Sequence, residues 1–181
     1  CLYGYTDKTF HLYEDDIPAE MVEQVAQRVC LVNEMIVWGA LRACTNSYFG
    51  GTGTTVATVN GVMTMNMLRK IAMNLLANHA RPVNSMLKNG INFGTDGVEE
   101  GFTVYIHTDC ESDIRDIPGF IPITRYATGT PMPHEIGRVE RFRFITSPDL
   151  VPIQNGGATV ANAPGVYSTS AANIDVYPFI V

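Results

Sequence analysis

The amino-acid sequence predicts an α+β fold, with helices in the first half of the chain and strands in the second. Two observations indicate the helices: apolar residues recur every three or four positions in residues 21–44, and a second pattern of this kind begins at Met65. A third observation indicates the strands, since apolar and polar residues alternate in residues 102–107. Gly and Asn are frequent in residues 88–100, so we expect the helix-rich part to end there.

The chain has 181 residues, which is enough for one sizeable domain or two small lobes. We divide it into three parts. Residues 1–16 are an N-terminal segment, residues 17–100 contain the helices, and residues 101–181 are rich in strands.

A long helix is predicted over residues 17–45. Asp15 and Asp16 suit its start because acidic side chains accept hydrogen bonds from the unpaired amides of a first turn, and Pro18 suits it because proline has no amide hydrogen to leave unpaired. The helix would be roughly 40 Å long at about 1.5 Å per residue, and would act as a spine for other elements. The glycines of residues 50–55 end it.

A second helix is predicted from Met65 to about Ala80, with Thr64 as its N-cap. Pro82 stops it, because proline disfavours helical geometry in the residue before it and cannot donate a backbone hydrogen bond. Residues 88–100 are predicted to be a loop.

The later elements are shorter. Residues 102–107 are predicted to form a strand, after which Asp109 caps a short helix that runs to Ile117. Residues 136–145 are predicted to form a second strand. The other predicted segments are an extended loop at 118–134, a weak edge strand at 151–153, a Gly/Asn/Ala loop at 154–165, and late strands at 166–168 and 174–181.

Composition and charge exclude some classes of protein. Charged residues make up 17% of the chain, below the usual share of about 25%, so contacts between subunits or uncharged polar residues must cover its surface. The net charge of −6 disfavours a protein that neutralises nucleic-acid phosphates. The apolar runs are much shorter than the roughly 18 residues of a membrane span. Because the chain begins with Cys and ends on an apolar run, we expect sequence to be missing at both ends.

The four cysteines are Cys1, Cys30, Cys44 and Cys110, and their spacing contains no C-x-x-C pair that would indicate a zinc site. Cys30 and Cys44 lie among apolar residues of the long helix. We therefore expect buried, reduced thiols, as in a protein made in the cytosol.

Two short segments invite a ligand-binding interpretation. Residues 50–55 are glycine-rich like a phosphate-binding loop, but they lack its lysine and follow a helix rather than a strand, so we interpret them as a helix stop and a loop. A metal site could be formed from His107, Asp109, Cys110 and Asp113. On a strand, however, Cys110 would point away from His107, and the Asp109 carboxylate would already be used as a helix cap, so we predict no metal.

Two polar groups lie near the predicted strand 136–145. His134 and Glu135 could be an acid–base pair, but neighbouring residues of a strand point to opposite faces. On one continuous strand, Arg141 and Arg143 would share a face and Arg138 would lie on the other. We predict that these arginines form ion pairs at a contact between subunits.

Several motifs occur in a recognisable order along the chain. Thr64 opens a helix that carries Leu68-Arg69-Lys70, the first strand ends in a His-x-Asp turn at residues 107–109, and Ile136-Gly137-Arg138-Val139 leads to Phe142-Arg143-Phe144. In this order they resemble the major capsid proteins of some podophages and prophages, a family similar in fold to the Hong Kong 97-type capsid protein. The chain departs from the family where it has Thr108 in place of a common Pro, and Arg141 in place of a frequent Gly.

The resemblance implies a Hong Kong 97-like capsid fold. Residues 17–100 would then be mainly the peripheral domain with its spine helix. Residues 101–181 would form the axial domain plus returning strands of the peripheral domain, and an N-terminal arm and extended loop would precede residue 1. The implied function is structural: self-association into the pentamers and hexamers of an icosahedral head that encloses double-stranded DNA, assembled in the bacterial host cytoplasm.

The same resemblance implies which partners to expect. Scaffold, portal or decoration proteins could bind the shell, and packaged DNA would touch it non-specifically. It implies no catalytic residue, cofactor or metal, and no membrane. Three alternatives stay open: an encapsulin-type nanocompartment shell, a small metal-dependent enzyme that uses His107, Asp109 and Cys110, and a non-enzymatic binding module.

Overall fold

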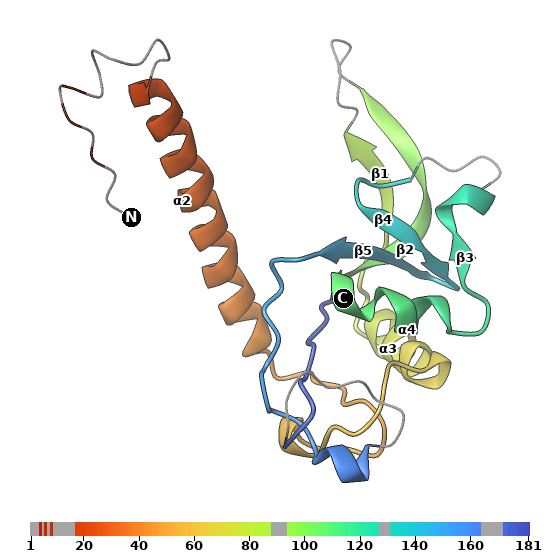
Figure 1. Ribbon diagram of the computed structural model, residues 1–181. Coiled ribbons are helices and arrows are strands. Elements are labelled where there is room, and N and C mark those ends of the chain that lie inside the picture. Colours follow the sequence, from red (N-terminus) through yellow and green to blue (C-terminus); the bar gives the residue numbers. More distant parts are fainter. Residues whose placement is uncertain are drawn as a thin grey trace. The chain divides into compact units, whose positions relative to one another are not determined.

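The structure is a computed structural model of the chain, and it describes residues 4, 6, 8, 17–87, 94–126, 131–163 and 172–181. The chain divides into two compact units, Cys1–Cys44 and Thr45–Val181. Helices and strands are both present, as predicted for an α+β fold (Figure 1).

The first unit contains the helix α2, Ile17–Arg42. It confirms the predicted long helix and ends three residues before the predicted end. Glu20 in its first turn and Arg42 in its last turn carry charges that suit the helix dipole at each end. The predicted caps Asp15 and Asp16 lie outside the described residues.

The second unit begins with a glycine-rich segment, a short 3₁₀ helix η1 (Val56–Thr58) and the helix α3 (Met65–Ala77). The predicted N-cap is confirmed, because the side chain of Thr64 accepts a hydrogen bond from the amide of Met67 at 3.4 Å. The helix ends three residues earlier than predicted. His79 adopts a left-handed backbone with φ of 57°, which ends the helix before Pro82 can do so.

A five-stranded mixed sheet, in the order β1-β2-β5-β4-β3, forms the centre of this unit. Strands β2 and β5 pair in parallel, and the other neighbours pair antiparallel. The strand bounds are Val83–Leu87 for β1, Thr95–His107 for β2, Ile121–Pro122 for β3, Glu135–Val139 for β4 and Phe142–Ser147 for β5.

The predicted loop over residues 88–100 is wrong in its described part, because residues 95–100 belong to β2. They pair with β1, a strand that the sequence analysis missed, and Gly101 lies opposite Val83. A side chain at Gly101 would come within 3.1 Å of the carbonyl oxygen of Arg141, so this glycine permits the β4–β5 turn to approach β2 closely and does not itself make a turn. Residues 88–93 lie outside the described residues.

The single strand predicted at 136–145 is also wrong, since the segment is a hairpin of β4 and β5. Glu140 makes the turn with a left-handed backbone, φ 49°. Non-glycine residues adopt this conformation uncommonly, and the segment lacks the Gly, Asn or Pro that usually indicates a turn. The consequence is that residues on the two sides of Glu140 lie on antiparallel neighbouring strands.

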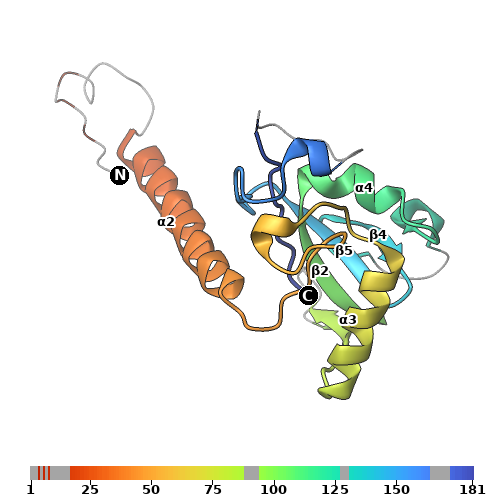
Figure 2. The same ribbon diagram turned by 90° about the horizontal axis from the view of Figure 1, so that it is seen from below.

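One face of the sheet forms the main core. The helices α3 and α4 (Glu111–Arg115) cover this face (Figures 1 and 2). Burying each of these large side chains contributes roughly 1.5–3 kcal/mol. The buried residues are Leu68, Ile71, Phe102, Val104, Ile106, Ile114, Ile117, Ile136, Val139, Phe142 and Phe144.

The link between β2 and α4 differs from its prediction. A 3₁₀ turn η2 (Thr108–Cys110) precedes the short helix α4, which confirms the helix but not its cap. The side chain that caps this turn is His107, whose Nδ1 accepts from the amide of Asp109 at 3.1 Å. The predicted loop at 118–134 contains β3 and a 3₁₀ helix η3 (Ile123–Arg125) in its described part.

The C-terminal residues join earlier parts of the same unit through single bridges. Ile153 pairs with Val176, Thr159 with Asn173, and Ile180 with Tyr105. These bridges replace the continuous strands predicted at 151–153 and 174–181, and a 3₁₀ helix η4 (Val160–Asn162) lies between them. The predicted strand at 166–168 lies outside the described residues. A second small core contains Val59, Ala163 and Ile174.

None of the helices in the described ranges combines the length and the apolar composition needed to cross a membrane.

Candidate functional site

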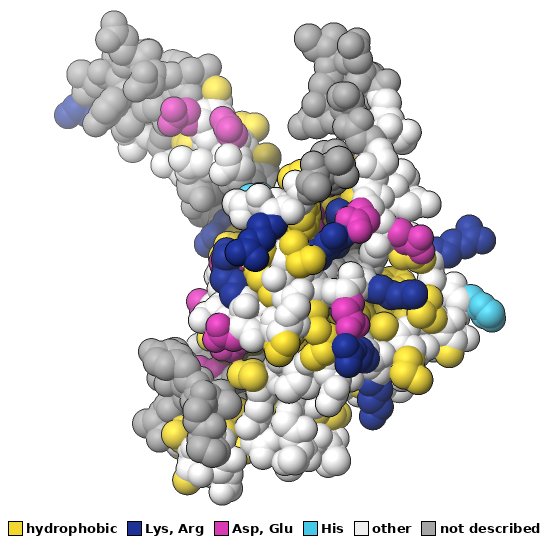
Figure 3. Space-filling view, turned by 90° about the vertical axis from the view of Figure 1, so that its right-hand side faces the viewer, with side chains coloured by type: hydrophobic (Ala, Val, Ile, Leu, Met, Phe, Trp, Pro, Cys, Tyr) yellow, Lys and Arg dark blue, Asp and Glu magenta, His cyan; other side chains and the backbone are white. Residues whose placement is uncertain are grey.

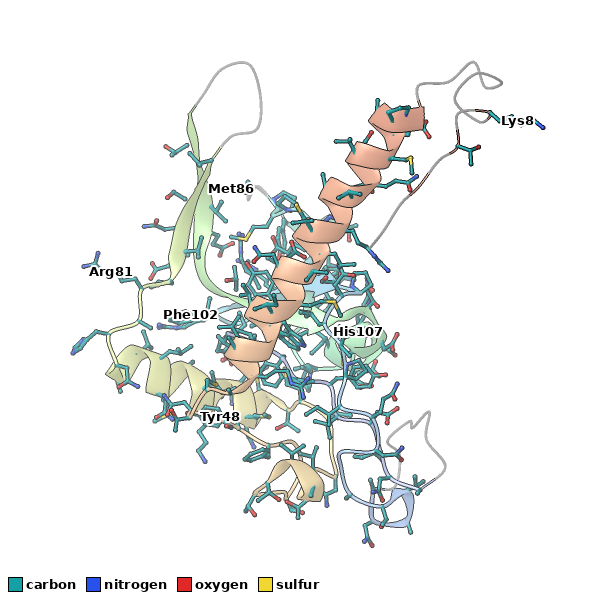
Figure 4. The ribbon with its side chains drawn as sticks, turned by 90° about the vertical axis from the view of Figure 1, so that its left-hand side faces the viewer. Lys8, Tyr48, Arg81, Met86, Phe102 and His107 are labelled. Carbon is teal, nitrogen blue, oxygen red and sulfur yellow. The ribbon has the colours of Figure 1, made fainter. Side chains whose placement is uncertain are left out.

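The helix α2 carries an exposed apolar stripe, which consists of Val22, Val25, Val29, Val32 and Ile36. Alternating steps of three and four residues place these side chains along one side of a helix. Their exposed fractions include 70% at Val22, 62% at Val29 and 66% at Ile36. Figure 4 shows the side chains of α2 as they project from the helix. Such a stripe is a candidate surface for packing against other protein.

The exposure of two cysteines contradicts a prediction. Cys30 and Cys44 were predicted to be buried, but both are exposed. The apolar pattern correctly indicates a helix at Cys30, whereas Cys44 lies beyond the end of α2 at Arg42. An apolar pattern by itself does not bury a side chain, because burial requires a second surface packed against it.

The glycine-rich segment 50–55 is a loop closed on itself, as predicted, but its glycines do not stop the long helix, because α2 already ends at Arg42. The amide of Thr52 donates to Asn60 Oδ1 at 2.9 Å, and the amides of Thr54 and Thr55 each donate to Thr58 Oγ1 at 3.0 Å. These amides would have to be available to bind phosphate. The loop therefore lacks the geometry of a phosphate-binding site.

The four predicted metal-ligand candidates do not form a metal site. Nδ1 of His107 already accepts from the Asp109 amide, and Tyr177 donates its hydroxyl to Asp109 Oδ2 at 3.0 Å. Burial, followed by the charges of Asp113 and Asp109, raises the pKa of the Cys110 thiol to about 12, so Cys110 stays protonated. In the described ranges, no three His, Cys, Asp or Glu side chains are placed to hold a metal ion.

His134 and Glu135 do not form an acid–base pair. His134 is exposed and has a left-handed backbone with φ of 59°, whereas Glu135 is buried. Both oxygens of Glu135 are occupied: Oε1 accepts from the Tyr126 hydroxyl at 2.6 Å, and Oε2 accepts from the Met132 amide at 2.7 Å. Glu135 is therefore part of a buried polar cluster.

The three arginines lie differently from the prediction. The hairpin places Arg138 and Arg143 directly opposite each other on β4 and β5, so they share a face of the sheet. Arg141 is in the turn and is exposed. Arg138 forms an ion pair with Glu99 of β2. The predicted ion pairing is confirmed for Arg138, but its partner belongs to the same chain.

Together these residues form an arginine cluster, which we define as Glu99, Tyr126, Glu135, Arg138 and Arg143. The guanidinium groups of Arg138 and Arg143 lie 5.3 Å and 5.9 Å from the centre of the Tyr126 ring. Nε of Arg143 is 3.6 Å from Oε1 of Glu135, and the side chains of both are almost completely buried. A buried ion pair is costly to desolvate, so each charge must be compensated by its neighbours.

The pKa shifts follow from this packing. Burial, and then the hydrogen bond to Glu135, raise the pKa of Tyr126 well above its ordinary value. The hydrogen bond from Arg138 lowers the pKa of Glu99, and the same bond raises the pKa of Arg138. Tyr126 and Glu99 were not singled out from the sequence, because each lies in a segment that was predicted to be a loop.

Charge on the visible surface is mixed. Figure 3 shows basic, acidic and hydrophobic side chains interspersed on one face. That face carries no continuous basic stripe of the kind that binds a nucleic-acid backbone. This agrees with the net charge of −6.

No protein-family model matches this chain, and no curated protein matches it significantly.

Proposed function

We propose that this chain is a structural subunit of a capsid shell with a Hong Kong 97-like fold. It self-associates into the pentamers and hexamers of the icosahedral head of a tailed bacteriophage or prophage, and the head encloses double-stranded DNA. Its partners are chiefly other copies of itself, and the assembled head is formed in the bacterial host.

The observation that carries this proposal is the exposed apolar stripe of α2. Val22, Val29 and Ile36 are each exposed by more than half, although they belong to one regular stripe. Leaving such a surface in water costs about 25 cal/mol for each Å² of apolar area. A protein surface that covers the stripe would recover this free energy, and a shell supplies many subunit contacts.

The arrangement of the motifs supports the choice of a capsid family. The His-x-Asp turn follows the end of β2, and the motif from Ile136 to Phe144 forms the β4–β5 hairpin. Strands β2 and β5 pair from Phe102 opposite Phe142 to His107 opposite Ser147. Segments that are separate in the sequence but carry the same resemblance therefore lie side by side. The low charge content and the negative net charge also suit a shell that holds DNA without binding it tightly.

Electron microscopy of the negatively stained full-length polypeptide tests the proposal. Closed polyhedral shells that contain DNA are the expected result. Shells that contain only protein cargo would instead identify a nanocompartment. A polypeptide that stays monomeric at high concentration, with and without a co-expressed scaffold, would contradict the proposal.

A matched pair of variants connects the test to α2. We expect Val29→Glu to prevent assembly, because it places a charge in the centre of the apolar stripe. Gln27→Glu is the control, since it introduces the same charge outside the stripe at an exposed position. Light scattering measures the particle mass of both. Equal assembly of the two variants would show that the stripe is not a contact surface.

A further inference from the structure

Arg143 is a buried cation whose hydrogen-bonding capacity is only partly used. Its side chain is 2% exposed. In the described part of the chain, neither Nη1 nor Nη2 has a hydrogen-bond partner. Buried polar atoms are nearly always paired in folded proteins, so two adjacent unpaired donor atoms indicate a group that completes the site.

Glu135 does not complete it. Its two oxygens accept from Tyr126 and Met132 at 2.6 Å and 2.7 Å. Its shortest approach to Arg143 is 3.6 Å and is made to Nε, not to the Nη atoms. Glu135 therefore offsets the charge of Arg143 without hydrogen bonding to the Nη side of the guanidinium.

The neighbouring charge favours an anion as the missing group. Arg138 lies opposite Arg143, and both guanidinium groups contact the ring of Tyr126. The acidic partner of Arg138 is Glu99, whose side chain is 54% exposed, so water screens its charge. Among the described residues, Glu135 is the one buried carboxylate that lies beside these two guanidinium groups.

We propose that the arginine cluster binds a small oxyanion, a carboxylate or a phosphate, through the Nη1 and Nη2 atoms of Arg143 beside Arg138. A planar guanidinium presents two parallel N–H donors that match the spacing of oxygens in these groups. The ring of Tyr126 lies against both guanidinium groups and its hydroxyl is held by Glu135, so we expect Tyr126 to slow the exchange of a bound anion. This proposal does not depend on the proposed shell function.

A direct test uses the full chain labelled with ¹⁵N-arginine. The side-chain N–H signals of Arg143 are followed by NMR during titrations with inorganic phosphate and with acetate, with ionic strength held constant by chloride. A saturable shift of the Arg143 signals with either ion is expected, and the ion that shifts them at lower concentration identifies the chemical class. The proposal would be overturned if neither ion produced a saturable shift. It would also be overturned if the only contact detected at the Nη atoms were with an exchanging, ordered water molecule.

Variants locate the binding. We expect Arg143→Lys to weaken binding by about tenfold or more, because it keeps the charge but lacks two parallel donors. Arg125→Gln is the matched control, since it removes an exposed arginine of the neighbouring helix η3 and should change affinity less than about twofold. Tyr126→Phe removes the bond to Glu135 and should speed anion exchange without loss of affinity. Equal weakening by Arg125→Gln and Arg143→Lys would overturn the proposal.

Discussion

The helix α2 and the strand pair β2–β5 both carry regularly spaced apolar side chains, but the helix leaves them exposed and the strands bury them. Ile36 of α2 is 66% exposed, whereas Val104 of β2 and Phe144 of β5 are 0% exposed. Periodicity is a property of one segment and predicts its local conformation. Burial depends on a second surface, which α3 and α4 provide for the sheet.

The largest expected effect is at Phe144. Phe144→Ala should lower the free energy of unfolding by about 3–5 kcal/mol, because it leaves a cavity in the core of the second unit. Ile36→Ala, the comparison in α2, should change that unfolding transition little, since Ile36 is exposed. Urea denaturation of both variants measures the difference. Similar losses would show that α2 is as tightly packed as the sheet.

The next largest effect concerns the other face of the sheet. Glu135→Ala should destabilise the fold by about 3 kcal/mol, because it leaves the buried charge of Arg143 without a carboxylate. The control is Glu140→Ala, which removes an exposed carboxylate paired with Arg69 and should have little effect. Thermal unfolding distinguishes them. If Glu135→Ala is as mild as its control, the cluster contributes little to stability.

A smaller effect is expected at the start of α3. Thr64→Ala removes the side chain that accepts from the Met67 amide, and should cost about 1 kcal/mol. Asn66→Ala, in the first turn of the same helix, should be neutral or slightly stabilising because alanine favours helix. The free energy of unfolding of both variants is measured by denaturation. Changes of opposite sign would show that the cap of Thr64 stabilises the start of α3.

The smallest effect is pH-dependent. Arg138 holds the pKa of Glu99 below its ordinary value of 4.5. The stabilising contribution of this pair is therefore complete above that ordinary value and is lost as the pH falls through the lowered pKa. It should be below about 1 kcal/mol because Glu99 is half exposed. Glu99→Gln should remove this part of the acid dependence, measured as unfolding between about pH 6 and pH 2, the range spanning a lowered carboxyl pKa. An unchanged profile would contradict the assignment.

The sequence alone determined the elements whose signals are local. The three- and four-residue spacing of apolar side chains placed α2, and Thr64 placed the start of α3. The alternation at residues 102–107 located the central part of the sheet. In each case the residues that form the pattern are also the residues that stabilise the element. These elements could therefore be predicted without knowing the rest of the chain.

Only the tertiary structure decided which strands pair and which polar groups meet. Gly101 lies in β2, where it leaves room for Arg141 of another segment, and Glu140 forms a turn although its residue type favours none. That turn brings Arg138 opposite Arg143, on the face where Tyr126 joins them. These contacts join segments far apart in the chain, and their free energy comes from packing and electrostatics between those segments. No pattern within a single segment of the sequence predicts these contacts.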